Sequence, residues 1–203
     1  MKNSIFKVNN ETGDPKLEDV KIGTQVWMTK NLGVDYFRNG DSIPHAATAE
    51  EWEKAGQNEQ PAWCYYDNVL ENGENYGKLY NWYAVNDPRG LAPEGYHIPS
   101  DNEWKMLTNY LEGEDFSGKK MKSSSGWNDN GNGTNESGFS GLPGGDRGYG
   151  GPFLNVGDYG TWWSSTEYDA DGAWGRSLSY HNGSVTSYKF TKTFGFSVRC
   201  LRD

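Results

Sequence analysis

The chain has 203 residues, of which 34% are hydrophobic and 15% aromatic, and it carries a formal net charge of −9. Nucleic acids and anionic membranes bind basic surfaces, so neither is an expected partner of this acidic chain. No stretch reaches the ~20 apolar residues of a membrane-spanning helix, and Met1–Asn10 lacks the apolar run of a signal peptide. The 27 glycines argue against an all-helical protein.

The N-terminal part predicts a polar lead-in at residues 1–19, followed by a single domain over residues 20–203. Val20–Met28 is typical of a strand, a glycine turn and a second strand. Thr48 stands three residues before Glu51, which is the spacing of a capping box at the start of a helix. Gly56 is suited to end that helix.

The clearest helix pattern begins at Ser100. Ser100 and Glu103 form a second capping box. Trp104, Leu107 and Leu111 then recur at positions i, i+3 and i+7, so we expect these three side chains to face the core.

The C-terminal half predicts a long ordered loop and then a meander of strands. Residues 113–158 are rich in Gly, Asn, Ser and Asp, and they contain only a few apolar residues that could anchor the loop to the core. Trp162 and Trp163 must point to opposite faces of a strand, so at most one of them can lie in the core beneath that sheet. Asn182-Gly183 is a strong hairpin-turn signal. The predicted strands are Gly160–Ser165, Ala173–Tyr180, Ser184–Phe190 and Phe194–Leu201.

Two cysteines leave two interpretations open. Cys64 lies in a predicted short strand, Trp63–Tyr66, and Cys200 lies in the last predicted strand. They are either two buried free thiols or a single disulfide that closes a very long loop.

Six short motifs occur along the chain: Ile22–Leu32, Tyr76–Gly95, His97–Trp104, Leu142–Gly145, Trp162–Glu167 and Gly195–Asp203. Together and in this order, they resemble the Fibrobacter succinogenes major paralogous (FISUMP) domain family. Two of the motifs, His97–Trp104 and the Gly-Phe…Arg ending, also resemble the wider superfamily of formylglycine-generating and sulfatase-modifying enzymes. The resemblance implies an α+β, C-type-lectin-like fold in which two helices flank a small antiparallel sheet with long ordered loops.

Residues of known catalytic types do not form a pattern that predicts an enzyme. The formylglycine-generating branch uses two closely spaced cysteines, whereas Cys64 and Cys200 stand in different motifs. The related iron-dependent sulfoxide synthases use a histidine facial site, but His45, His97 and His181 lack helical i, i+4 spacing. His97 is most simply a packed, hydrogen-bonded histidine. We therefore expect no catalytic residues, and an unusual enzyme of this superfamily stays an alternative.

One loop is a candidate for calcium. Asp129–Glu136 gathers oxygen-bearing side chains on a glycine-rich segment, which suits a hard cation. Gly131 stands where an EF-hand needs a ligand, and the same composition is typical of turns. We expect no cofactor, with a structural calcium ion as the alternative.

The C-terminal strands carry the candidate ligand-binding residues. Trp174, Arg176, Leu178 and Tyr180 share one face of a predicted strand, and Tyr and Arg on a rigid sheet beside polar loops are typical of recognition surfaces. Alternatively, Trp174 and Leu178 belong to the core and Arg176 is a solvated neighbour. The predicted binding residues are Tyr168, Asp169, Asp171, Trp174, Arg176, Tyr180, His181, Asn182 and Tyr188.

These features predict a non-catalytic domain that binds a protein or glycan at a bacterial or phage surface, outside the cell or on a virion. C-type-lectin-like proteins diversified by retroelements vary in this same region, and Tyr180–Tyr188 consists of residues reachable by mutating adenines in Asn codons. A receptor-binding adhesin is therefore a more specific hypothesis. The competing class is a structural or assembly module of a surface protein or fibre.

Overall fold

The computed structural model describes residues 18–203. Most of the lead-in predicted at residues 1–19, and the whole of Met1–Asn10, lie outside the described residues. The first strand begins at Asp19, where the lead-in was expected to end.

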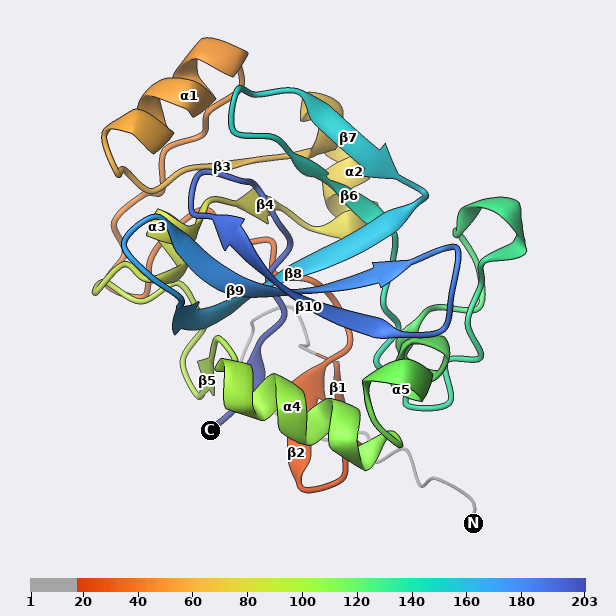
Figure 1. Ribbon diagram of the computed structural model, residues 1–203. Helices are drawn as coiled ribbons and strands as arrows, with labels where there is room; N and C mark the ends of the chain where they lie inside the picture. The colour runs from red at the N-terminus through yellow and green to blue at the C-terminus, as the bar shows by residue number, and fades with distance from the viewer. Residues whose placement is uncertain (1–17) are drawn as a thin grey trace.

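Three sheets organise the described part of the chain (Figure 1). One sheet has the order β1-β2-β11-β5 and pairs the N-terminal hairpin with the final strand; its members are β1 (Asp19–Ile22), β2 (Gln25–Met28), β11 (Leu201–Arg202) and β5 (Tyr96–His97). The largest has the order β10-β9-β8-β6-β7, formed by β10 (Val185–Thr191), β9 (Gly172–Ser179), β8 (Tyr159–Glu167), β6 (Gly144–Arg147) and β7 (Phe153–Val156). The smallest pairs β3 (Trp63–Cys64) with β4 (Leu79–Tyr80).

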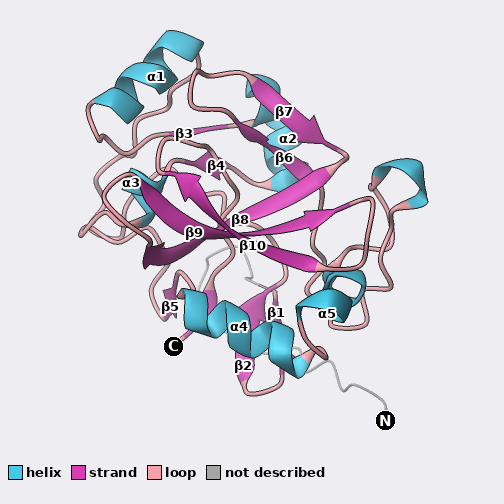
Figure 2. Cartoon of the chain, viewed as in Figure 1, coloured by secondary structure: helices cyan, strands magenta, loops and turns pink. Residues whose placement is uncertain are grey.

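Helices lie at both ends of the molecule, with the largest sheet between them (Figure 1). They are α1 (Ala49–Gln57), α2 (Leu70–Tyr76), α3 (Trp82–Val85), α4 (Asp101–Tyr110) and α5 (Glu114–Met121), with short 3-10 turns η1 (Tyr66–Asn68) and η2 (Asn128–Asn130). In Figure 1, α1 lies at the opposite end from α4, and α4 lies close to β1, β2 and α5. Loops join most of these elements (Figure 2). The fold is thus a mixed one of helices and sheets.

Both capped helices predicted from sequence are confirmed. The Thr48 side chain accepts a hydrogen bond from the Glu51 backbone amide, and Ser100 and Glu103 form the second capping box. Gly56 does not end α1 but lies within its last turn. A Cβ atom at this position would lie 2.8 Å from the Thr193 side chain. Glycine serves close packing at this position rather than termination.

The core of α4 is also as predicted. Trp104 and Leu107 are fully buried, and Leu111, just after the helix, is nearly so. All three belong to one hydrophobic cluster.

The prediction of an irregular loop over residues 113–158 is wrong in part. This segment contains α5, β6 and β7. Abundant glycine is typical of loops, yet Gly118 lies inside α5. A Cβ atom at this position would lie 2.3 Å from the carbonyl oxygen of Ser184. Gly145 in β6 likewise leaves no room for a side chain beside Leu154 and Tyr66. Several of the glycines are therefore close-packing positions inside regular elements.

The two adjacent tryptophans of β8 point to opposite faces, as predicted. Trp162 packs in the cluster that contains Trp104, whereas Trp163 packs in the cluster that contains Phe196. Both indoles are essentially inaccessible to solvent. Each face of β8 therefore has its own core, and neither tryptophan is left for binding.

The predicted last strand, Phe194–Leu201, is only partly regular. Strand β11 covers its end, and isolated bridges hold the rest, including Phe196 to Tyr80 and Ser197 to Trp162. Buried residues follow one another without alternation, since Arg199 is as inaccessible as Cys200. This segment therefore runs through the interior between the sheets instead of extending one of them.

Candidate recognition site

The hairpin of β9 and β10 carries most of the predicted binding residues but divides them between two faces. In its register, Trp174 is opposite Lys189, and Gly175 is opposite Tyr188. Because side chains alternate along a strand, Trp174, Arg176 and Lys189 share one face and Tyr188 lies on the other. The predicted residues therefore do not form one continuous surface.

An aromatic pair lies at the turn between β8 and β9. Tyr168 is 52% exposed, and its ring is 4.9 Å from that of half-buried Trp174, at an interplanar angle of 70°. Lys189 joins this pair: its ammonium lies 5.2 Å from the centre of the Tyr168 ring and forms an ion pair with Asp169. The hydrogen bond between them lowers the pKa of Asp169 and raises that of Lys189, so both groups remain charged near neutral pH.

Two networks hold this turn in place. The carboxylate of Asp169 accepts a hydrogen bond from the Asp171 backbone amide at 3.1 Å. The buried ammonium of Lys192 donates to the carbonyl oxygen of Ala170 at 2.7 Å and pairs with Glu167. The exposed side chains are thus presented on a fixed backbone, which lowers the entropy lost when a ligand binds.

The opposite end of the hairpin carries a second group. His181 and Asn182 are exposed, Tyr180 is half-buried, and the rings of Tyr180 and His181 are 3.7 Å apart. Strand β9 has 8 residues, so this group lies about 25 Å from the turn at Tyr168. The two groups are too far apart for one small ligand to contact both.

The hairpin predicted around Asn182-Gly183 is confirmed, because β9 and β10 pair in antiparallel fashion on either side of these residues. Strand β9 ends at Ser179 and β10 begins at Val185, so the connection is slightly longer than the predicted strand ends imply. Asn182 accepts a hydrogen bond from the Ser184 amide at 3.0 Å, and its carbonyl accepts one from Lys122 at 2.8 Å. Contacts with the α5 region, rather than hairpin geometry, therefore set this loop.

Arg176 is not a surface residue, and its prediction as a ligand-binding group is corrected. The residue is 1% exposed, and its guanidinium donates to the carboxylate of Asp101 at 2.6 Å. The first turn of α4 covers this part of the β9 face. Leu178 on the same face is buried in the core, which agrees with the alternative interpretation of that residue.

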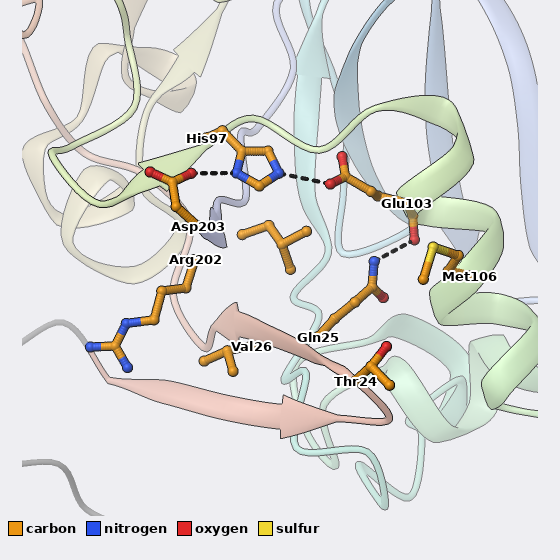
Figure 3. A pocket seen from close by; sticks show the side chains of 9 residues that line it. Thr24, Gln25, Val26, His97, Glu103, Met106, Arg202 and Asp203 are labelled. Atoms are coloured by element: carbon orange, nitrogen blue, oxygen red, sulfur yellow. Dashed lines mark hydrogen bonds and ion pairs between the residues drawn. The ribbon is translucent and has the colours of Figure 1, made fainter.

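A separate hollow of about 390 Å³ opens beside His97 (Figure 3). The imidazole lies between two carboxylates, with Nδ1 2.7 Å from Asp203 and Nε2 2.8 Å from Glu103. Burial acts to lower the pKa of His97, but the hydrogen bonds to Asp203 and Glu103 raise it above its usual value. The expectation of a hydrogen-bonded histidine is confirmed, whereas neither this open hollow nor the role of Asp203 was predictable from local sequence.

The His97 arrangement differs from that of a catalytic dyad. In a catalytic dyad, one ring nitrogen faces a carboxylate and the other is free to take a proton from the nucleophile. Here each nitrogen faces a carboxylate, and Thr24 contributes a hydroxyl to the lining without a hydrogen bond to the ring. The geometry is that of an ionic bridge between β5, α4 and the residue after β11.

The polar loop at residues 129–136 uses several of its side chains to close turns. Asn132 accepts a hydrogen bond from the Trp127 amide at 3.0 Å, and Asn135 accepts one from the Ser140 amide at 2.8 Å. Among the residues that the structure describes, no group of three or more His, Cys, Asp or Glu side chains is arranged to hold a metal ion.

The two cysteines are buried free thiols, not a disulfide. Cys64 and Cys200 belong to different hydrophobic clusters. Burial raises the pKa of Cys64 to about 11 and that of Cys200 to about 12. Neither is therefore a reactive thiolate at neutral pH.

Comparison with known proteins supports one family. The family model described as the Fibrobacter succinogenes major domain matches residues 20–202. No curated protein matches the chain. Within residues 18–203, no helix has the length and apolar character needed to cross a membrane.

Proposed function

We propose that this chain, which belongs to the Fibrobacter succinogenes major domain family, is a non-catalytic recognition domain that binds a ligand on a bacterial or phage surface. The observation that carries the proposal is the pair of Tyr168 and Trp174 at the β8–β9 turn. Asp171 and Lys189 lie beside this pair, and Tyr188 lies on the opposite face of the same hairpin. These five residues, which span both faces of the hairpin, are called the recognition surface below.

The composition of this surface suits binding. Tyr168 and Tyr188 are 52% and 57% exposed, although large aromatic side chains usually gain stability from burial. Asp171 is exposed, and the ion pairs of the described residues do not include it. Rigid aromatic groups beside charged ones are the usual anchors of recognition surfaces.

We propose a non-catalytic role because the groups best suited to catalysis are occupied or buried. Both nitrogens of His97 face carboxylates, and both thiols are buried with raised pKa values. We propose that the domain works without a cofactor, outside the cell or on a virion. The C-type-lectin-like fold implied by the sequence motifs is part of this proposal, as is retroelement diversification of the hairpin.

A second candidate function is assembly of a surface structure. Strand β7 is an edge strand of the largest sheet, and its Leu154 and Val156 are 44% and 37% exposed. An edge strand with exposed apolar side chains is suited to contact a neighbouring subunit. The sequences of paralogous domains encoded in the same genome would separate the two functions. Sequence variation confined to residues 164–189 favours an adhesin, and evenly spread variation favours an assembly module.

The direct test uses arrays of glycans and cell-surface proteins probed with the wild-type chain and two variants. Tyr168→Ala should lower the affinity for any bound ligand about tenfold or more, because truncation of an aromatic anchor costs ~2 kcal/mol. Tyr149→Ala is the matched control, since Tyr149 is 68% exposed but belongs to another loop. Equal binding by the two variants would contradict the proposed site, and weaker binding by Tyr149→Ala alone would place it elsewhere.

A further inference from the structure

The free edge of β10 offers a second kind of contact beside the recognition surface. Strand β10 is at the end of the five-stranded sheet and pairs only with β9 among the described strands. The Lys192 amide donates to the carbonyl oxygen of Asp171 at 3.1 Å, which continues the β9–β10 ladder past Thr191. Hydrogen-bonded pairs alternate along an antiparallel ladder, so the backbone groups of Ser187 and Lys189 point away from β9.

Contacts elsewhere in the chain limit the free part of this edge to its centre. At one end, the Lys119 amide of α5 donates to the carbonyl of Gly183. At the other, the Phe194 amide donates to the carbonyl of Thr191. Between these points, the outward backbone groups of β10 have no hydrogen-bond partner within residues 18–203.

We propose that the ligand of this domain is an extended segment of a protein that adds as a new strand to the β10 edge; this inference rests on the proposed recognition function. A row of unpaired N–H and C=O groups is complementary to the backbone of another extended chain. About three or four backbone hydrogen bonds fit the free stretch, because only alternate residues of a strand face its edge.

The division of the aromatic residues between two faces supports a strand as the occupant. Tyr188 and half-buried Phe190 lie on one face of the hairpin, while Trp174 and Lys189 lie on the other. A flat ligand that covers one face of the hairpin cannot contact the aromatic residues on the other face. An added strand projects successive side chains to both faces, so it contacts both groups at once.

The same geometry predicts the pattern of the bound segment. Its side chains on one face pack beside Tyr188, which is 57% exposed and 6.1 Å from the ring of Phe190, so apolar residues are expected there. Side chains on the other face lie beside Ser187 and Lys189. Only long ones reach Trp174, which is one strand further, about 10 Å from the added backbone.

The test removes an outward N–H group without breaking the β9–β10 ladder. Proline is tolerated on an edge strand where its nitrogen faces solvent, so Ser187→Pro should fold, whereas it blocks a partner strand. Ser187→Ala is the matched control, because it removes the same side chain and keeps the N–H. The probe is a library of random linear heptapeptides displayed on phage and selected on the wild-type chain.

The expected result is that selected peptides bind Ser187→Ala as they bind the wild type, and bind Ser187→Pro about tenfold or more weakly. Synthetic peptides with one N-methylated backbone position at a time provide a second measurement on the wild-type chain. Methylation should weaken binding only at alternate positions. This arm stays decisive if Ser187→Pro does not fold.

Two results would overturn the inference and leave the recognition function intact. One is peptide binding that is insensitive both to Ser187→Pro and to N-methylation while Tyr168→Ala still weakens it. The other is a library that yields no peptide while a glycan array gives a Tyr168-dependent ligand. If neither probe class binds the wild type in a Tyr168-dependent way, the recognition function and the strand addition both fail.

Discussion

Arg176 of β9 and Asp101 in the first turn of α4 form a buried ion pair, with 2.6 Å between Nη2 and Oδ1. The same aspartate also pairs with Lys105 one helical turn later. Burial acts to raise the pKa of Asp101, but hydrogen bonds from Lys105 and Arg176 hold it below its usual value. The pair fixes α4 against the strand that presents Trp174.

We expect Arg176→Met to lower the free energy of unfolding by about 3–5 kcal/mol, because removing one member of a buried pair leaves the other charge poorly compensated. The double variant Arg176→Met, Asp101→Asn should recover part of that loss. Urea denaturation of the two single variants and the double variant measures the coupling. Strictly additive effects would show that the two side chains do not interact in solution.

Stability should depend on the protonation of His97. Its pKa is raised by Asp203 and Glu103, so its contribution is fully present below the unfolded value, ~6.5, and is lost as pH rises through the higher folded value. Asp203 should separate first, since Glu103 is also held by the Ser100 amide at 2.8 Å.

The measurement is the melting temperature between about pH 6 and pH 9, together with NMR titration of the imidazole. The wild type should lose stability over this range, and His97→Gln should lose less. Parallel pH profiles for the two proteins would contradict an energetic role of the bridge.

Local signals were enough to predict the capped helices. A capping box places its two residues three positions apart, so Ser100 and Glu103 meet as soon as the helix forms. The periodicity of Trp104 and Leu107 is likewise a property of one helix, and both are buried as expected.

Contacts between distant segments were not predictable in this way. Arg176 has the alternation of a surface residue, yet it is buried because α4, 75 residues earlier, covers it. Lys189 and Lys192 were missed because their roles depend on strand register and on the turn at Asp169. The open hollow at His97 depends on where the chain returns beside β5.

Trp104 should be a principal core anchor. Its ring is fully buried and lies 4.8 Å from Trp27 and 5.8 Å from Phe139. Trp104→Ala should therefore lower the free energy of unfolding by about 3–5 kcal/mol. Met106→Ala on the same helix is the control, because Met106 is 52% exposed and its truncation should cost far less. Comparable destabilisation by the two variants in thermal denaturation would be inconsistent with this assignment.

Both thiols should be unreactive in the native protein. Cys64 and Cys200 are inaccessible to solvent, and burial raises the pKa of each. Iodoacetamide at pH 8 should leave the folded chain unmodified and label both cysteines in denaturant, as read by intact mass. Reduction before labelling should change neither result. Labelling that requires reduction would instead reveal a disulfide.

Lys192 should control the rigidity of the recognition surface without touching a ligand. Its ammonium is buried, donates to the carbonyl of Ala170 and lies 4.9 Å from the centre of the Trp82 ring. Lys192→Met keeps most of the side-chain volume but removes the donor that holds the turn. Ala170 is exposed, so water can replace that hydrogen bond and the loss of global stability should be small.

The expected consequence is local. Amides of residues 168–172 should exchange with deuterium about tenfold faster in Lys192→Met, since the turn loses an anchor. The affinity for a ligand that needs Tyr168 should fall because more entropy is lost on binding. Lys21→Met is the control, because Lys21 is exposed and belongs to β1, in a different sheet from this turn. If exchange at 168–172 were the same in Lys192→Met as in the control, the turn would owe its order to Asp169 and Lys189 alone.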